Sequence, residues 1–193
     1  KRGHTAQEVV EAVTRLKQHD MIVGVQLLPG LKGETWQTII ETAITVAALQ
    51  PDFIRIYPVL VIENTELADQ YRDGEYEPLS TELAIQYCAF LKNWFEQHGI
   101  EVIRTGLQST EELDSGNSLV AGPYEPAMGE LVVNEQYKQR IKRCIDEHVS
   151  QYKYSLSNDC FNLTEYATYE NLGFSRVNAD NTGCKDKTNN DKT

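Results

Sequence analysis

The 193-residue sequence contains few cysteines, and they stand far apart from one another. No CxxC or CxxxCxxC spacing occurs, so there is no local set of thiolates of the kind that holds zinc or an iron–sulfur cluster. Nothing else indicates a disulfide scaffold, and we interpret the thiols as reduced. The cysteines are Cys88, Cys144, Cys160 and Cys184. We expect no metal site in this chain.

Long apolar runs and a surplus of basic residues are also missing. No stretch is long and apolar enough to predict a membrane-spanning helix, and no signal peptide is recognisable. Lys and Arg number 18 against 29 Asp and Glu, a net charge of −11. Nucleic-acid affinity comes chiefly from neutralising phosphates, so this balance argues against a free-standing nucleic-acid binder. We expect a cytoplasmic protein that has no membrane partner.

What the sequence does contain is an alternation of helical and strand patterns. Thr5 and Glu8 form a capping box ahead of apolar residues at helical spacing. The patterns predict helices over residues 6–19, 35–49, 65–71, 80–97 and 133–148, and strands over residues 21–28, 53–62 (interrupted at Pro58) and 101–107. Connections of ordinary length favour parallel strands with crossover helices. The fold class is therefore α/β, either as a barrel or as an open sheet.

The composition changes beyond Ser109. Residues 114–129 are rich in Gly, Ser, Asn and Pro, which predicts a loop, and residues 178–193 almost lack apolar side chains. A segment with so little apolar surface to bury does not fold by itself, so we expect residues 178–193 to be disordered.

Two arginines interrupt the predicted strands. Alternation along residues 53–57 puts Arg55 on the face opposite Ile54 and Ile56, and Arg104 ends the strand that follows residue 100. An arginine in a strand is costly to bury unless it meets an anion or a carboxylate. Two interpretations stay open: a structural salt bridge at the end of the sheet, or a polar cavity in which both arginines hold a substrate.

A glycine-rich turn, VQLLPGLKGET over residues 25–35, joins a predicted strand to a predicted helix. It is not a phosphate-binding P-loop, because Lys32 precedes Gly33 where GxxxxGK[ST] requires the lysine to follow, and GxGxxG is absent too. Either the chain only turns here, or backbone N–H groups at a helix N-terminus face a ligand. No histidine or carboxylate cluster suggests acid–base chemistry.

Several of these stretches resemble one family. They are KRGHT (1–5), GVQLLPGLKGET (24–35), PDFIRIYPVLV (51–61) with NTELADQYRDGEY (64–76), VIRTGLQ (102–108) and GPYEPAMGELV (122–132). Together, over residues 1–143, they resemble the radical S-adenosylmethionine (SAM) enzymes. The nearest group is the bacterial proteins related to the Elongator catalytic subunit, and the oxygen-independent coproporphyrinogen oxidases are more distant.

The resemblance implies part of a partial (β/α)₆ barrel that binds SAM and a [4Fe–4S] cluster. Cleavage of SAM there would give a 5′-deoxyadenosyl radical for hydrogen abstraction, and kinship suggests a tRNA uridine as the substrate. By this resemblance residues 1–108 are the C-terminal half of the barrel, residues 109–150 a family loop and helix, and residues 151–193 a partly disordered polar tail. Its partners would be the N-terminal half of the barrel and tRNA.

The same resemblance assigns residues to the site. It implies that Arg2 contacts the SAM carboxylate and that Gln26 contacts the ribose. Ile56 and Tyr57 would lie beside the adenine. The residues expected in a substrate cavity, without an assigned role, are Arg55, Arg104 and Gln108.

This sequence also departs from the family. Lys32 replaces the usual proline of the turn, Glu125 and Met128 stand where histidine and phenylalanine are common, and Thr105 replaces an aliphatic residue. The largest departure is the missing CxxxCxxC, which we expect to lie ahead of this chain in an intact protein. By itself the chain should therefore be inactive and bind neither cofactor tightly. Alternatives are a non-catalytic binding or assembly domain and a coproporphyrinogen-oxidase-like oxidoreductase.

Overall fold

The computed structural model describes residues 3–108, 110–114, 116 and 118–155. The chain divides into two compact units, Lys1–Ile145 and Asp146–Thr193. The disorder expected over residues 178–193 lies outside the described residues.

The described chain contains both helices and strands, which alternate except where two strands, and then two helices, follow each other directly. The helices are α1 (Ala6–Gln18), α2 (Trp36–Ala48), α3 (Glu66–Arg72), α4 (Thr81–Gln97), α5 (Glu111–Asp114) and α6 (Met128–Ser155). The strands are β1 (Gly24–Leu27), β2 (Phe53–Ile56), β3 (Val61–Ile62), β4 (Glu101–Thr105) and β5 (Leu119–Ala121). Within these ranges, no helix combines the length and the apolar character that a membrane span requires.

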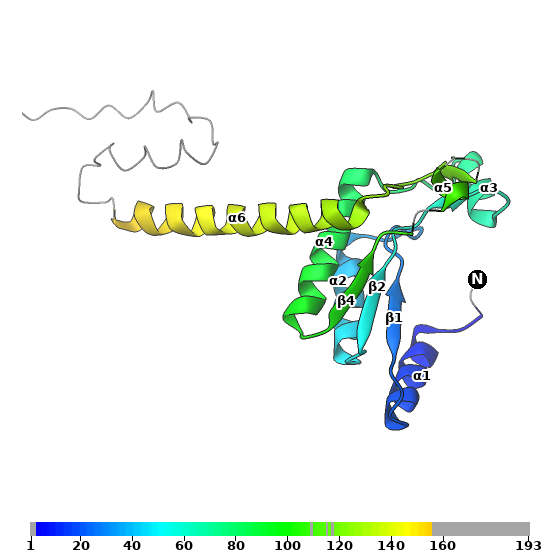
Figure 1. The fold of residues 1–193 in the computed structure, drawn as a ribbon, viewed down its shortest axis with the longest axis horizontal. Coiled ribbons are helices and arrows are strands. Elements are labelled where there is room, and N and C mark those ends of the chain that lie inside the picture. The colour runs from blue at the N-terminus through cyan, green and yellow to red at the C-terminus, as the bar shows by residue number, and fades with distance from the viewer. Residues whose placement is uncertain (1–2, 109, 115, 117, 156–193) are drawn as a thin grey trace, which may run out of the picture. The chain divides into compact units, whose positions relative to one another are not determined.

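The main sheet has the order β1-β2-β4 and is parallel throughout (Figure 1). Each crossover contains a helix, α2 between β1 and β2 and α4 between β2 and β4. The predicted α/β class and the parallel strands are thus confirmed. A parallel sheet with crossover helices is also the arrangement expected of part of a (β/α) barrel.

Helices α2 and α4 pack against each other and cover one face of this sheet (Figure 1). Ile54 and Ile56 of β2 are completely buried against them, together with Ile39 of α2 and Phe95 of α4. The strict alternation of β2 leaves Arg55 exposed on the opposite face. One side of the sheet is therefore a hydrophobic core, and the other side is open and polar.

Local sequence signals place the starts of α1, α2 and α4 correctly. The Thr5 hydroxyl accepts a hydrogen bond from the Glu8 N–H, while the Glu8 carboxylate accepts one from the Thr5 N–H at 2.6 Å. This is the predicted capping box of α1. Thr35 and Ser80 likewise accept hydrogen bonds at the N-termini of α2 and α4.

The segment after Pro58 does not continue the main sheet, as the prediction of one interrupted strand over residues 53–62 assumed. It forms β3, which pairs antiparallel with β5 in a separate two-stranded sheet. The predicted loop over residues 114–129 was therefore wrong at residues 119–121. Gly122 allows this pairing, because a side chain there would lie 3.2 Å from the backbone of Leu60.

Helix α6 begins at Met128, five residues ahead of the predicted start at residue 133. Its first residue lies directly against the end of β4. A Cβ atom on Gly106, which has φ of +84°, would come within 2.5 Å of the Met128 Cβ. Glycine thus permits both the turn after β4 and the close approach of the helix.

Candidate functional site

The open face of the main sheet carries a row of polar side chains. Backbone pairing sets Gln26 of β1 opposite Arg55 of β2, and Arg55 opposite Arg104 of β4. All three residues are exposed. Three residues predicted at the site from separate stretches of sequence thus form one line across three strands.

The guanidinium of Arg55 lies over an aromatic ring. Its guanidinium carbon lies 5.6 Å from the ring centroid of Phe53, two residues earlier on the same face. The Phe53 ring in turn lies over Gly24 of β1, where even a methyl group would overlap it. A glycine on one strand therefore makes room for the ring that orients the arginine on the next strand.

Arg104 reaches its position through an irregularity in the β2–β4 ladder. Ile54 pairs with Val102, but Arg55 pairs with Arg104, so β4 has one extra residue at Ile103. Strict alternation would have given Arg104 the same face as Val102, which packs against the core. The bulge instead puts Arg104 opposite Arg55. The Arg104 Nη1 then donates to the Gln108 Oε1 at 2.8 Å.

The remaining residues assigned to SAM lie in different surroundings. The Ile56 side chain is completely buried in the core under α2 and α4, so only its backbone can face a ligand on the open side of the sheet. Tyr57 follows β2, is half-buried, and donates its backbone N–H to the Leu27 carbonyl at 2.9 Å. Arg2 lies outside the described residues. The SAM roles of these three residues and of Gln26 remain predictions.

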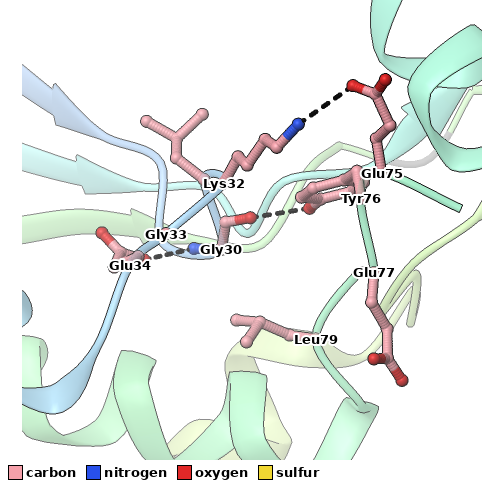
Figure 2. A pocket seen from close by; sticks show the side chains of 9 residues that line it. Gly30, Lys32, Gly33, Glu34, Glu75, Tyr76, Glu77 and Leu79 are labelled. Carbon is pink, nitrogen blue, oxygen red and sulfur yellow. Dashed lines mark hydrogen bonds and ion pairs between the residues drawn. The ribbon is translucent and has the colours of Figure 1, made fainter.

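The glycine-rich turn lies at the C-terminal end of β1 and is held from two directions (Figure 2). The Gly30 N–H donates to the Glu34 carboxylate at 2.5 Å, and the Gly30 carbonyl accepts from the Tyr76 hydroxyl at 2.6 Å. Gly30 has φ of +105° and packs under Leu79, which a Cβ atom would approach to 3.1 Å. Both backbone groups of Gly30 are thus fixed by side chains.

Beside this turn is a small hollow of about 210 Å³. Its lining residues are Gly30, Leu31, Lys32, Gly33, Glu34, Glu75, Tyr76, Glu77 and Leu79. Lys32, which replaces the family's proline, pairs with Glu75 across the hollow at 3.2 Å (Figure 2). Burial raises the pKa of Glu34, and the hydrogen bond from Gly30 opposes that shift.

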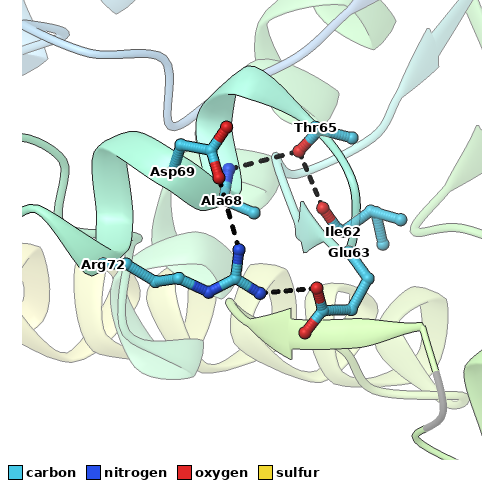
Figure 3. Close-up of polar contacts among 6 residues, drawn as sticks. All are labelled: Ile62, Glu63, Thr65, Ala68, Asp69 and Arg72. Carbon is cyan, nitrogen blue, oxygen red and sulfur yellow. Dashed lines mark hydrogen bonds and ion pairs between the residues drawn. The ribbon is translucent and has the colours of Figure 1, made fainter.

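The segment that carries Tyr76 is anchored through α3. Figure 3 shows the Arg72 guanidinium between two carboxylates, with Nη2 2.5 Å from the Glu63 Oε2 and Nη1 3.4 Å from the Asp69 Oδ1. Thr65 caps the helix by accepting from the Ala68 N–H, and its hydroxyl donates to the Ile62 carbonyl at 2.7 Å. The stretch over residues 64–76 therefore brings Tyr76 to the turn.

Sequence reasoning did not identify Tyr76, Glu34 or Leu79 as parts of the site. Tyr76 and Glu34 both lie inside stretches that carry the family resemblance, which was the one available signal. The contact of Tyr76 with Gly30 links segments that are 46 residues apart along the chain. Local patterns do not contain that information.

The described residues do not fit an iron–sulfur cluster. No group of three His, Cys, Asp or Glu side chains in the described ranges could hold a metal ion. Cys88 is fully buried in α4, where desolvation raises the pKa of its thiol to about 12, and Cys144 lies exposed on α6. SAM is a better match, because Gln26 presents a hydrogen-bonding side-chain amide on the open face of the sheet.

Comparison with known proteins assigns this arrangement to a class. Residues 51–139 match the Radical_SAM C-terminal domain. Among solved structures, the archaeal Elp3 of Methanocaldococcus infernus, with an N-terminal deletion (1–46), has a TM-score of 0.60 at 28% identity, covering 72% of this chain and 32% of that chain. The parallel sheet and its crossover helices are thus shared with a radical SAM protein.

Curated relatives agree with this assignment. The tRNA uridine(34) acetyltransferase of Methanocaldococcus jannaschii is 32% identical over 149 residues, which are 75% of this chain and 26% of that protein. That of Methanocaldococcus infernus is 30% identical over 149 residues, 75% of this chain and 27% of that protein. The chain corresponds to a C-terminal part of a radical SAM protein of the Elp3 group, which confirms the resemblance. It spans about a quarter of the length of these relatives.

Proposed function

We propose that this chain forms the C-terminal, SAM-facing part of a radical SAM enzyme that modifies a tRNA uridine. The observation that carries the proposal is the polar row on the open sheet face of a chain that matches the Radical_SAM C-terminal domain. The relatives named tRNA uridine(34) acetyltransferase supply the substrate class. Their names favour acetyl transfer over oxidoreduction as the overall reaction.

In this proposal the chain's own residues bind and orient SAM. The Gln26 amide would hydrogen-bond the ribose, and the half-buried Tyr57 would lie beside the adenine. Completely buried Ile54 and Ile56 keep β2 in a fixed position beneath the ligand. When bound together with a reduced [4Fe–4S] cluster, SAM would supply the hydrogen-abstracting chemistry of this family. The cluster would be held by residues other than those described.

The test uses the intact protein that contains this chain. After anaerobic reconstitution of its cluster, it should release 5′-deoxyadenosine from SAM and modify a tRNA uridine. Absence of SAM cleavage with a fully loaded cluster would contradict the proposal and favour a non-catalytic binding or assembly domain.

Two substitutions test the assigned SAM contact. Gln26→Ala should weaken SAM binding about fivefold to tenfold, the loss expected for one hydrogen bond, when measured by calorimetry. Gln86→Ala, on the exposed side of α4 away from the open face, is the matched control and should leave the affinity unchanged. Equal affinities for the two variants would refute the role of Gln26.

A further inference from the structure

Two positive charges lie side by side on the open face of the main sheet. Arg55 and Arg104 are direct backbone partners on adjacent strands, which lie about 4.8 Å apart in any sheet. Like charges directly opposite each other on neighbouring strands destabilise a sheet. The bulge at Ile103 creates this juxtaposition, since a regular ladder would keep the two side chains on different faces.

Neither guanidinium is neutralised within the part of the chain that the structure describes. Arg55 stacks on the uncharged ring of Phe53, and Arg104 donates to the uncharged amide of Gln108. By contrast Arg72 meets both Glu63 and Asp69. Although the chain has 29 acidic residues against 18 Lys and Arg, no carboxylate among the described residues pairs with Arg55 or Arg104, so both remain open to an anionic ligand.

The contacts with Phe53 and Gln108 leave N–H donors of both guanidiniums free toward solvent. A guanidinium carries five N–H groups, of which Arg104 uses one for Gln108, and the ring below Arg55 leaves the edges of its guanidinium accessible. Gln26 continues the row on β1 with an exposed side-chain amide. Arg55 and Arg104 therefore offer two adjacent cations with free donors to one ligand, next to the neutral amide of Gln26.

We propose that Arg55 and Arg104 together bind one phosphate group of the nucleotide substrate; this inference rests on the proposed function. One arginine already satisfies both oxygens of a carboxylate through its planar fork. A phosphate is tetrahedral and directs its oxygens apart, so it can accept from guanidiniums on two different strands. Binding one anion to both arginines would also cancel the repulsion between them.

The experiment titrates the full chain with uridine 5′-monophosphate (UMP) at low salt, following the arginine side-chain N–H signals by NMR. UMP should bind about tenfold more tightly than uridine, because only UMP carries the phosphate. Arg55→Gln and Arg104→Gln should each weaken UMP binding by about tenfold, and the double variant should lose little more than either one. Arg140→Gln, an exposed arginine on α6, is the matched control and should bind as the wild type does.

Three results would overturn the inference. They are undetectable UMP binding, equal affinities for UMP and uridine, and unchanged UMP affinity in both arginine variants. Methionine serves as the carboxylate probe: if it binds as tightly as UMP and is lost with the same arginines, the pair is a carboxylate site and the phosphate assignment is wrong. Both arginines are exposed, so circular dichroism should show native folding in every variant.

This test is independent of SAM cleavage, since it needs neither the cluster nor turnover. Loss of phosphate binding in a protein that still modifies tRNA would refute only the inference. Retained phosphate binding in a protein that does not cleave SAM would refute only the proposed function.

Discussion

The hydroxyl of Tyr76 donates a hydrogen bond to the carbonyl oxygen of Gly30 at 2.6 Å, and the donor is buried. Tyr76 follows α3, while Gly30 lies in the connection between β1 and α2. The bond therefore ties the smaller cluster of Val59, Val61, Ala68 and Tyr76 to the turn at the C-terminal end of β1. The shape of the turn depends on a residue outside the turn itself.

Removing this hydroxyl should loosen the turn without changing the size of the core. Tyr76→Phe leaves the Gly30 carbonyl without its donor, which should lower the free energy of unfolding by about 1–2 kcal/mol. Urea denaturation measures the difference. Tyr137→Phe, on the exposed surface of α6 with 58% of its surface accessible, is the matched control and should be within about 0.5 kcal/mol of the wild type. Equal stabilities of the two variants would contradict a structural role for the bond.

Glu34 should give the turn a pH dependence. Burial raises its pKa in the folded protein above the ordinary value of 4.5, so the folded state holds this proton more tightly than the unfolded state. The stability gained from the protonated form is present below about pH 4.5 and is lost as the pH rises through the raised folded-state pKa. Glu34→Gln keeps an acceptor for the Gly30 N–H but cannot ionise.

The free energy of unfolding of Glu34→Gln, relative to the wild type, should therefore increase between pH 4.5 and pH 7. Urea titrations at several pH values measure this difference directly. A constant difference over the whole range would show that folding does not perturb the titration of Glu34.

Local patterns were sufficient for much of the fold. The capping box of Thr5 and Glu8 placed the start of α1, and the alternation of Ile54, Arg55 and Ile56 identified both faces of β2. These signals depend on neighbours in sequence, where hydrogen bonding and side-chain direction follow directly from the backbone. The order of elements then predicted the parallel sheet.

What could not be predicted depends on contacts between distant segments. The bulge that moves Arg104 opposite Arg55 is a property of the β2–β4 register, whereas strict alternation along β4 would put Arg104 on the other face. Strands β3 and β5 have two and three residues, too few for a periodic signal, and they pair across more than one helix. Gln26, Arg55 and Arg104 were each predicted as site residues, but only the structure shows that they are aligned across three strands.

Gly24 should be essential for the position of the Phe53 ring. A methyl group at this residue would overlap the ring, so Gly24→Ala should displace Phe53 and lower the free energy of unfolding by about 1–3 kcal/mol. The matched control is Gly129→Ala in α6, where a Cβ atom would have an ordinary contact of 3.5 Å with the Thr105 carbonyl. Thermal denaturation should show the control unchanged or slightly stabilised by its better helix propensity. Similar losses in both variants would contradict the steric argument.

Gln136 should fix the start of α6 on α4. Its buried side-chain amide donates to the Asn93 Oδ1 at 2.9 Å and to the Glu96 Oε2 at 3.1 Å. Gln136→Leu removes both hydrogen bonds but keeps a side chain of similar size, and should lower the free energy of unfolding by about 1–3 kcal/mol. Hydrogen exchange should show faster opening of the first turns of α6, while β2 stays protected.

The matched control for this last substitution is Gln139→Leu, one turn further along the same helix. Gln139 donates only within α6, to the Glu135 Oε1 at 3.1 Å, so its loss should cost less than about 0.5 kcal/mol. If both variants lose the same stability, apolar packing of Met128 and Val132 holds α6 in place and the polar contacts of Gln136 do not.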